Sequence, residues 1–353
     1  MRIGYVPRFY RPSYYDRRYA LRSRLGNRLK NRGVHALAHL RRKLYFSPID
    51  GFFEEALYHA GDVTQRSYRN LQALAASRDD AVVVHFRAAP GRLRGEDDEL
   101  VAIARACSGT KALFIDADEA AVMKDDRVLD CYDVVFKREP FADPDRYPVA
   151  MRNRDKIRPT MLSCPYFQHS PYRALSRRRH VAAIDAEAKP ADADVFFIGK
   201  ATDARLAAWR TLATIPGIRR AGGLLPRIGF DNDPDLMTSP LDVPSFISHL
   251  KTSRISLAVD GHGEFTFRHL EIWCAGGFLL ASSSLREISL PIDAREGEHF
   301  ECYDDLDDLR EKVAHYATRP DRCREIAANG KKLFDSQYDT GRHGQDILKA
   351  LGG

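Results

Sequence analysis

Short apolar runs alternate with helix-like segments in the first half of the chain. The runs are rich in β-branched and aromatic residues, which is typical of buried parallel strands. Strands are expected at residues 1–6, 81–86, 111–115 and 133–137, and helices at 52–59, 66–77 and 97–107. This alternation predicts an α/β domain with a doubly wound parallel sheet.

The pattern breaks between residues 140 and 190, where seven prolines recur, and then resumes. We interpret the break as a crossover between domains. In the second half, strands are expected at 194–198, 254–259 and 278–281, and helices at 204–213, 306–317 and 321–334. A chain of 353 residues suits two such domains. We therefore predict domains at 1–165 and 190–336, with residues 337–353 packing back on the first domain.

The charge distribution changes this picture at the N-terminus. Residues 1–43 hold thirteen Lys or Arg and one acid, Asp16, with tyrosines interleaved, whereas the whole chain carries a net charge of +6. Such a stretch fits an anionic membrane surface or a phosphorylated acceptor, although a solvated basic helix is the plain alternative. Nucleic acid would match the charge, but no base-reading motif accompanies it, so this partner is disfavoured.

Cysteine spacing and hydropathy indicate the compartment. The six cysteines form no CxxC pair, so neither a disulfide framework nor a zinc site is expected. No apolar run approaches the roughly 20 residues of a membrane span, and the basic N-terminus lacks the apolar core of a secretory signal. We expect a cytoplasmic protein, with the basic stretch allowing peripheral contact with the inner membrane face.

The segment 254–280 combines several features of an anion site. After the strand come Asp260, Gly261, His262 and Gly263, where glycines permit a tight turn and close approach of a ligand. A helix is expected to begin near Glu264 or Phe265, and its free N–H groups suit a pyrophosphate at the carboxyl end of the sheet.

Two charged residues follow on this helix. Arg268 could pair with phosphate and Glu271 with ribose hydroxyls, and Gly276-Gly277 should end the helix with a left-handed cap. The plain alternative is that Arg268 and Glu271 pair with each other in solvent. The order of strand, Gly turn, Arg, Glu, Gly-Gly and strand favours a donor-binding site.

These residues carry a resemblance to a known group. The run Asp260-Gly261-His262-Gly263, with Arg268, Glu271 and Gly276, resembles the donor half of GT-B glycosyltransferases, whose fold pairs two Rossmann-like domains across a cleft. It is most similar to the CAP10-like O-glucosyltransferase and lipopolysaccharide-modifying group, and to the module of spore-maturation-type glycosyltransferases. Further similar motifs are Gly199 with Arg205 upstream, and His299-Phe300 and Ile326-Ala327 to Gly330 downstream.

The resemblance implies a donor and an acceptor class. The donor would be a nucleoside-diphosphate sugar, most simply UDP-linked, and the acceptor a cell-envelope glycan, lipopolysaccharide or lipid-linked sugar. Neither an essential metal nor another cofactor is implied. The expected donor-binding residues are Gly199, Lys200, Arg205, Asp260, Gly261, His262, Gly263, Arg268 and Glu271. For Gly199, Lys200 and Arg205, an ordinary loop and helix surface is the plain alternative.

An inverting enzyme also needs a base for the acceptor hydroxyl. The resemblance implies an Asp one residue after Arg87, but Ala88 stands there. The candidates therefore become Asp116 and Asp118 at the next strand end. His85 is a further candidate as base or sugar contact, with a buried hydrogen-bonded histidine as its plain alternative.

Two other interpretations remain open at this stage. Asp116-Ala117-Asp118 has the D-x-D form with which GT-A glycosyltransferases hold Mn²⁺ or Mg²⁺. The missing Asp after Arg87 would also fit a non-catalytic GT-B-like scaffold that binds nucleotide or glycan. Neither the sugar, the acceptor, the anomeric outcome nor the oligomeric state follows from the sequence.

Overall fold

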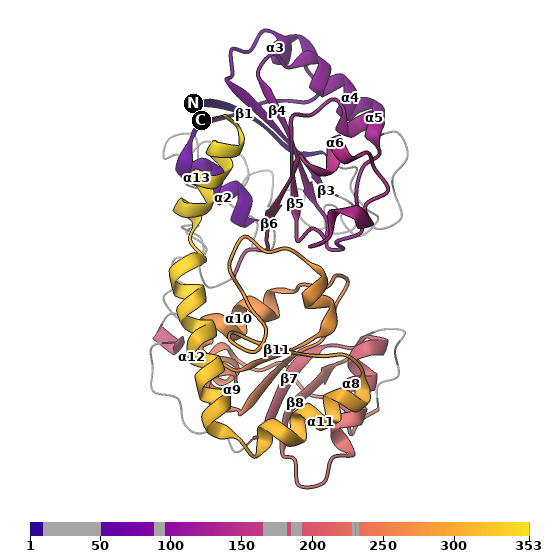
Figure 1. The fold of residues 1–353 in the computed structure, drawn as a ribbon, viewed down its shortest axis with the longest axis vertical. Coiled ribbons are helices and arrows are strands. Elements are labelled where there is room, and N and C mark those ends of the chain that lie inside the picture. The colour runs from indigo at the N-terminus through magenta and orange to yellow at the C-terminus, as the bar shows by residue number, and fades with distance from the viewer. Residues whose placement is uncertain are drawn as a thin grey trace, which may run out of the picture.

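The computed structural model describes residues 1–9, 51–87, 96–164, 182–184, 193–227, 230 and 233–352. They form two α/β domains stacked along the long axis of the molecule (Figure 1). The first sheet has the order β2-β1-β3-β4-β5-β6, and every neighbouring pair is parallel. Its strands are β1 (Arg2–Phe9), β2 (Asp62–Gln65), β3 (Ala81–Arg87), β4 (Thr110–Asp116), β5 (Val134–Arg138) and β6 (Ile157–Thr160).

Alternate residues of each central strand face opposite helical layers. Val83 and Phe114 pack in a cluster with residues of α2 (Gly51–Ala60) and α13 (Thr340–Ala350). Val82 and Leu113 pack in another cluster with residues of α3 (Leu71–Ala75), α4 (Glu96–Ala106) and α5 (Asp126–Leu129). Because both faces are covered, the central strands are apolar throughout, as the sequence predicts.

The second sheet has the order β11-β10-β9-β7-β8 and is also parallel throughout. Its strands are β7 (Val195–Lys200), β8 (Arg220–Leu225), β9 (Ile255–Ala258), β10 (Leu279–Ser282) and β11 (Glu301–Tyr303). One face packs with α8 (Asp203–Ala213) and α11 (Leu306–Ala317), and the other with α9 (Val243–Thr252), α10 (Phe267–Ala275) and α12 (Pro320–Gln337). The predicted doubly wound arrangement is confirmed in both halves.

Edge elements depart from the sequence-based expectations. The helix expected at 66–77 is only the five-residue α3, and the edge strand β2 precedes it. Strands β6 and β8, at sheet edges, were not expected at all. β6 has four residues including Pro159, and β8 contains Gly222 and Gly223 with φ of +89° and +144°. Short strands with Pro or Gly lack the apolar periodicity that identifies the central strands.

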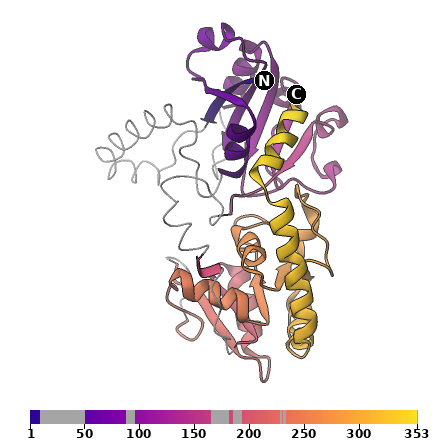
Figure 2. The ribbon, with the colours of Figure 1, turned by 90° about the vertical axis from the view of Figure 1, so that its left-hand side faces the viewer.

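The C-terminal helices connect the two domains. α12 lies on the second domain and α13 on the first, so together they run along one side of both (Figures 1 and 2). Tyr338 stands between them and stacks on Phe52 at 4.4 Å and on Phe334 at 4.7 Å between ring centroids. Its hydroxyl donates to the Leu162 carbonyl at 2.9 Å and accepts from the Cys164 amide at 2.6 Å. The chain thus returns to the first domain at a buried aromatic anchor.

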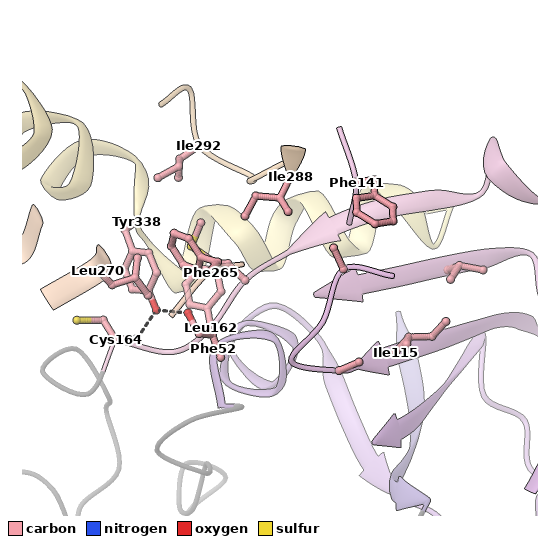
Figure 3. Packing of buried hydrophobic residues seen from close by; sticks show 14 of the residues in the cluster. Phe52, Ile115, Phe141, Leu162, Cys164, Phe265, Leu270, Ile288, Ile292 and Tyr338 are labelled. Carbon is pink, nitrogen blue, oxygen red and sulfur yellow. Dashed lines mark hydrogen bonds between the residues drawn. The ribbon is translucent and has the colours of Figure 1, made fainter. Parts of the chain in front are cut away.

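Apolar side chains also join the domains directly. Figure 3 shows Leu162 of the first domain near Phe265 of the second, and Phe141 of the first near Ile288 of the second. All are buried and belong to one continuous hydrophobic cluster that includes residues of both sheets. The pairing of Phe141 with Ile288 adds an antiparallel bridge between the domains. The two domains therefore share part of their core.

Close packing of α13 on α2 depends on Gly344. A Cβ built at this residue would lie 2.5 Å from the Ala56 carbonyl oxygen and 2.7 Å from Ala60 Cβ. We expect Gly344→Ala to lower the free energy of unfolding by about 1–3 kcal/mol, because α13 must move away from α2. Urea denaturation measures this change.

The matched control is Gly341→Ala in the same helix. This residue is exposed, and its added Cβ would meet only the end of the Asp339 side chain. Here alanine should be neutral or slightly stabilising, by up to about 1 kcal/mol. Equal destabilisation by both substitutions would contradict the packing argument.

Candidate functional site

Two loops meet where the domains face each other. One follows β4 and carries Asp118, and the other follows β9 and carries Gly263. A Cβ built on Gly263 would lie 1.6 Å from the Asp118 carbonyl oxygen, so only glycine fits this contact. The Ala120 amide also donates to Glu264 Oε2 at 2.9 Å. The carboxyl ends of strands from both sheets therefore border one junction, as in other open α/β ligand sites.

The helix after the second loop begins later than the sequence suggests. α10 starts at Phe267, not at Glu264 or Phe265, with Thr266 at its N-cap. Nδ1 of His269 accepts from the Thr266 amide at 3.1 Å, which places His269 at the reciprocal position of a capping box. The helix ends at Gly276 with φ of +77°, so the predicted left-handed cap is confirmed.

Arg268 lies in the first turn of α10 and is fixed from three sides. Its Nη2 donates to the Ile198 carbonyl of β7 at 2.9 Å, and its guanidinium lies 4.4 Å from the ring centroid of Phe246. Nη1 pairs with Glu271 at 2.8 Å. Arg268 and Glu271 therefore pair with each other, as one of the two interpretations of the sequence held. The pair is not in solvent, however, because the Arg268 side chain is only 17% exposed and the Glu271 side chain 8%.

Arg205, near the start of α8, lies beside this pair. Its guanidinium donates to the Lys200 carbonyl at 3.1 Å and to the Val259 carbonyl at 3.3–3.4 Å. Within the described residues it makes no ion pair with a carboxylate. Burial lowers the pKa of Arg205, and the charge of Arg268 lowers it further, while Asp260 raises it. Two neighbouring cations at the end of β7 form a site suited to an anion.

The glycines around Arg205 have separate roles. A Cβ on Gly261 would lie 3.1 Å from Arg205 Nη2, and a Cβ on Gly199 would lie 3.5 Å from Arg205 Nη1. Because both residues are glycines, no Cβ atom lies against the guanidinium at these two positions. Gly263 instead contacts the opposite domain. The sequence suggested that this glycine permits the approach of a ligand, but its lack of a side chain permits the contact between the domains. His262 and Lys200 are exposed at the edge of the site.

Three polar residues of this site were missed in the sequence. Ser284 Oγ donates to Asp260 Oδ1 at 2.7 Å, and Ser282 Oγ accepts from the Asp260 amide at 3.3 Å and bonds to the Tyr303 hydroxyl at 3.0 Å. Burial raises the pKa of Asp260 despite the Ser284 bond. The sequence did offer a signal for the two serines: they come at the end of an apolar strand, and residues there lie at the carboxyl edge of the sheet, where ligands bind.

On the first domain, Asp116 is the centre of a buried charge network. Its Oδ2 contacts His85 Nε2 at 3.0 Å and Arg87 Nη1 at 3.3 Å, and its Oδ1 accepts from Arg138 Nη1 at 2.6 Å. The His85 ring also bonds to the Tyr5 hydroxyl at 2.7 Å. His85 is thus a buried, hydrogen-bonded histidine, which was its plain alternative, and it is not placed to contact a substrate.

The same network excludes Asp116 from direct chemistry. Burial acts to raise the pKa of Asp116, but the charge of Arg138 and the bond from His85 outweigh it and hold this pKa well below its usual range. Its side chain has no exposed surface. A carboxylate that is inaccessible and fully paired cannot accept a proton from an acceptor hydroxyl. Asp118, with a side chain 48% exposed, remains the candidate base at this strand end.

Arg138, also missed in the sequence, occupies the carboxylates of the D-x-D motif as their counter-ion. Its guanidinium bonds to both Asp116 and Asp118, and to Glu139 Oε2 at 3.1 Å. A protein cation therefore lies where the GT-A interpretation places a metal. The described residues contain no cluster of three or more His, Cys, Asp or Glu that could hold one. The two-domain architecture independently contradicts the GT-A alternative.

Several expectations fall outside the described residues. These are the basic stretch from residue 10 to 43 and Ala88. Within the described residues, no helix is long and apolar enough to cross a membrane.

Replacing Asp116 tests the buried network. We expect Asp116→Asn to lower the free energy of unfolding at pH 7 by about 3–5 kcal/mol, because it leaves Arg138 buried without its main counter-charge. Since folding depresses this pKa, the contribution is present above the unfolded value near 4 and is lost as pH falls below it. The difference between wild type and variant should therefore narrow below about pH 4.

Urea denaturation across this pH range measures the effect. Asp130→Asn is the control, because Asp130 pairs with Arg152 at 2.8 Å on the exposed surface. That change should cost much less. A variant of Asp116 as stable as wild type at pH 7 would show that the network does not stabilise the fold.

Comparison with known proteins agrees with this geometry. The family model described as "Glycosyl transferase-like" matches residues 207–349, which include α10 and the C-terminal helices. No curated protein matches the chain.

Two solved structures of HepE from Anabaena, one with UDP and glucose and one with UDP-glucose, are 10% and 11% identical. They align over 100% of this chain and 99% of theirs, with TM-scores of 0.54 and 0.53. The chain also aligns with an α-glucosyltransferase in complex with UDP and DNA, over 82% of this chain and 85% of that one, at 10% identity and a TM-score of 0.46. The glycosyl transferase-like module and the two facing parallel-sheet domains make this chain a glycosyltransferase with the GT-B fold.

Proposed function

We propose that the enzyme transfers a sugar from a UDP-linked donor, whose diphosphate binds between Arg205 and Arg268. The observation that carries this proposal is the pair of neighbouring guanidinium groups at the end of β7, beside the first turn of α10. Both now donate to backbone carbonyls, which phosphate oxygens would replace as stronger acceptors. The Anabaena HepE structures contain UDP, glucose and UDP-glucose, which supports UDP as the nucleotide.

The remaining donor contacts follow from position. Lys200 and His262 are exposed at the rim and would reach the phosphates or the sugar. Glu271, which now pairs with Arg268, would exchange part of that pairing for the ribose hydroxyls. Asp260 would order the loop through its bonds to the serines after β10. The motif that joins these residues also supports kinship with the CAP10-like group.

The chemistry proposed is direct displacement without a metal. The acceptor oxygen forms a bond to the anomeric carbon, the bond from that carbon to the phosphate oxygen breaks, and UDP leaves with the electron pair. Arg205, Arg268 and the N-terminus of α10 stabilise the charge on the leaving diphosphate. Asp118 would take the proton of the acceptor hydroxyl, because its carboxylate is exposed at the junction.

For the acceptor we propose a cell-envelope glycan, lipopolysaccharide or lipid-linked sugar. The support is the basic stretch 1–43, whose charge suits a phosphorylated acceptor or an anionic membrane surface. The enzyme would then act in the cytoplasm, peripherally on the membrane. Nucleic acid remains the disfavoured partner, since the sequence contains no base-reading motif.

Three substitutions test the donor site by calorimetric titration. Arg205→Ala and Arg268→Ala should each weaken binding of UDP about 10- to 100-fold, because each removes a charge-assisted contact with phosphate. Glu271→Ala should weaken binding of UDP more than binding of inorganic pyrophosphate, because it removes the ribose contact in addition to the pairing with Arg268.

Arg210→Ala is the matched control, because Arg210 lies in the last turn of the same α8 and is exposed. Its UDP affinity should equal that of wild type. Unchanged UDP affinity in both Arg205→Ala and Arg268→Ala would refute the assignment.

A panel of nucleotide sugars tests the reaction itself. We expect the enzyme to release sugar slowly from one UDP-sugar, with or without EDTA, since the proposed mechanism uses Arg side chains and not a metal to stabilise the leaving group. Release is measured as free UDP. A melting temperature that rises with UDP but no sugar release from any donor would leave only the binding function, and complete loss of release in EDTA would contradict the metal-free mechanism.

A further inference from the structure

One peptide group at the domain junction is held by charged groups from both domains. The Glu119 carbonyl accepts from Lys137 Nζ at 3.1 Å, and the Ala120 amide of the same peptide donates to Glu264 Oε2 at 2.9 Å. Lys137 is fully buried at the end of β5 in the first domain, whereas Glu264 belongs to the loop before α10 in the second. A single peptide plane is thus clamped between a lysine cation and a carboxylate of the opposite domain.

Most of this loop is fixed by the first domain alone. Lys137 Nζ also donates to the Arg138 carbonyl at 2.7 Å, so carbonyls of β5 and of the loop together fix its ammonium. The Ala120 carbonyl accepts from the Tyr147 hydroxyl at 2.9 Å, and that hydroxyl accepts from the Phe141 amide at 3.0 Å. The Ala120 N–H is satisfied by the second domain. A buried amide needs a hydrogen-bond partner. The Ala120 amide therefore has its partner only when the two domains are in contact.

Asp118 lies two residues before this amide and is constrained by the same loop. Its carbonyl oxygen lies against Gly263, the residue before Glu264, and its carboxylate is held by Arg138. Movement of Glu264 would therefore shift both the peptide it binds and the backbone of Asp118. A shift of about 1 Å at a proton-accepting group is enough to lower a rate substantially.

Glu264 is equally close to the donor side. Two residues later Thr266 caps α10, and Arg268 and Glu271 follow within the next two turns. Phe265 is buried and stacks on the capping His269 at 4.8 Å between ring centroids. The loop from Gly263 to Thr266 is therefore a short, packed connection between the proposed diphosphate site and Asp118.

We infer that Glu264 is a positioning residue that couples donor binding to the placement of Asp118. Donor binding at the start of α10 stabilises the existing bond from the Ala120 amide to Glu264, and so holds Asp118 toward the acceptor hydroxyl. Glu264 itself touches neither substrate. This inference rests on the proposed function for the identity of the donor and the base.

Other contacts across the junction provide an internal control. Arg146 Nη1 pairs with Glu287 Oε2 at 2.7 Å, and both side chains are exposed. The Ala142 amide donates to the Glu287 carbonyl at 2.8 Å. Glu287, like Glu264, is an acid of the second domain that bonds to the first, but it bonds to a segment beyond β5 and not to the loop of Asp118. Removing it should loosen the junction without affecting the clamp.

The experiment compares Glu264→Ala, Glu264→Gln and Glu287→Ala in the full chain. With Glu264→Ala we expect UDP affinity within about twofold of wild type, kcat for transfer lowered roughly 10- to 100-fold, and a higher ratio of donor hydrolysis to transfer. Glu264→Gln should recover most of the transfer, because its amide oxygen still accepts from the Ala120 N–H. Glu287→Ala should leave kcat near wild type.

Amide hydrogen exchange of residues 117–120 adds a readout that does not require activity. UDP should slow exchange at the Ala120 amide in wild type and in Glu287→Ala, but not in Glu264→Ala. Equal exchange in wild type and Glu264→Ala, or an equal fall of kcat in Glu264→Ala and Glu287→Ala, would overturn the inference. If wild type shows the exchange effect but transfers no sugar, the proposed reaction fails while the clamp stands.

Discussion

The arrangement of this enzyme depends on one backbone contact, in which the carbonyl of Asp118 lies against Gly263. No other residue type fits at position 263, because a Cβ would overlap the carbonyl oxygen. This contact sets the separation of the loops after β4 and β9, and the bond from the Ala120 amide to Glu264 sets their relative orientation. The donor and acceptor sides of the site are brought together by chain geometry before any ligand is bound, which reduces the ordering cost of catalysis.

The two sides of the junction differ in how their charges are satisfied. On the first domain Arg138 is enclosed by carboxylates, and Asp116 is in turn enclosed by cations and His85, so this network stabilises the strand ends. On the second domain the Arg205 guanidinium, next to Arg268, donates only to carbonyl oxygens among the described residues. Neighbouring cations of this kind favour a bound anion. The charged residues of the first domain therefore stabilise the fold, whereas those of the second domain are suited to binding an anion.

The central elements of the fold could be predicted from the sequence, whereas its edges could not. Runs such as 81–86 and 194–198 are buried on both faces, so their composition alone identifies them. Strands β6 and β8 carry Pro or Gly at sheet edges, where fewer side chains are buried and no periodicity arises. The Gly276 cap was predictable because its cause is local.

Site residues could likewise be predicted where their neighbours are close in the sequence, but not where they depend on distant contacts. Arg268 and Glu271 were found because strand, turn and helix follow each other in sequence. Arg138 was missed because it acts on residues about twenty positions earlier, across neighbouring strands. The role of Gly263 was misjudged, since its partner lies in the other domain.

The most direct test of the account is a crystal structure of the enzyme with UDP. We expect the diphosphate within hydrogen-bond distance of the Arg205 and Arg268 guanidinium groups and beside the first turn of α10, with the Ala120 amide still bonded to Glu264. A diphosphate bound elsewhere, with both arginines still donating to the carbonyls of Lys200, Val259 and Ile198, would contradict it.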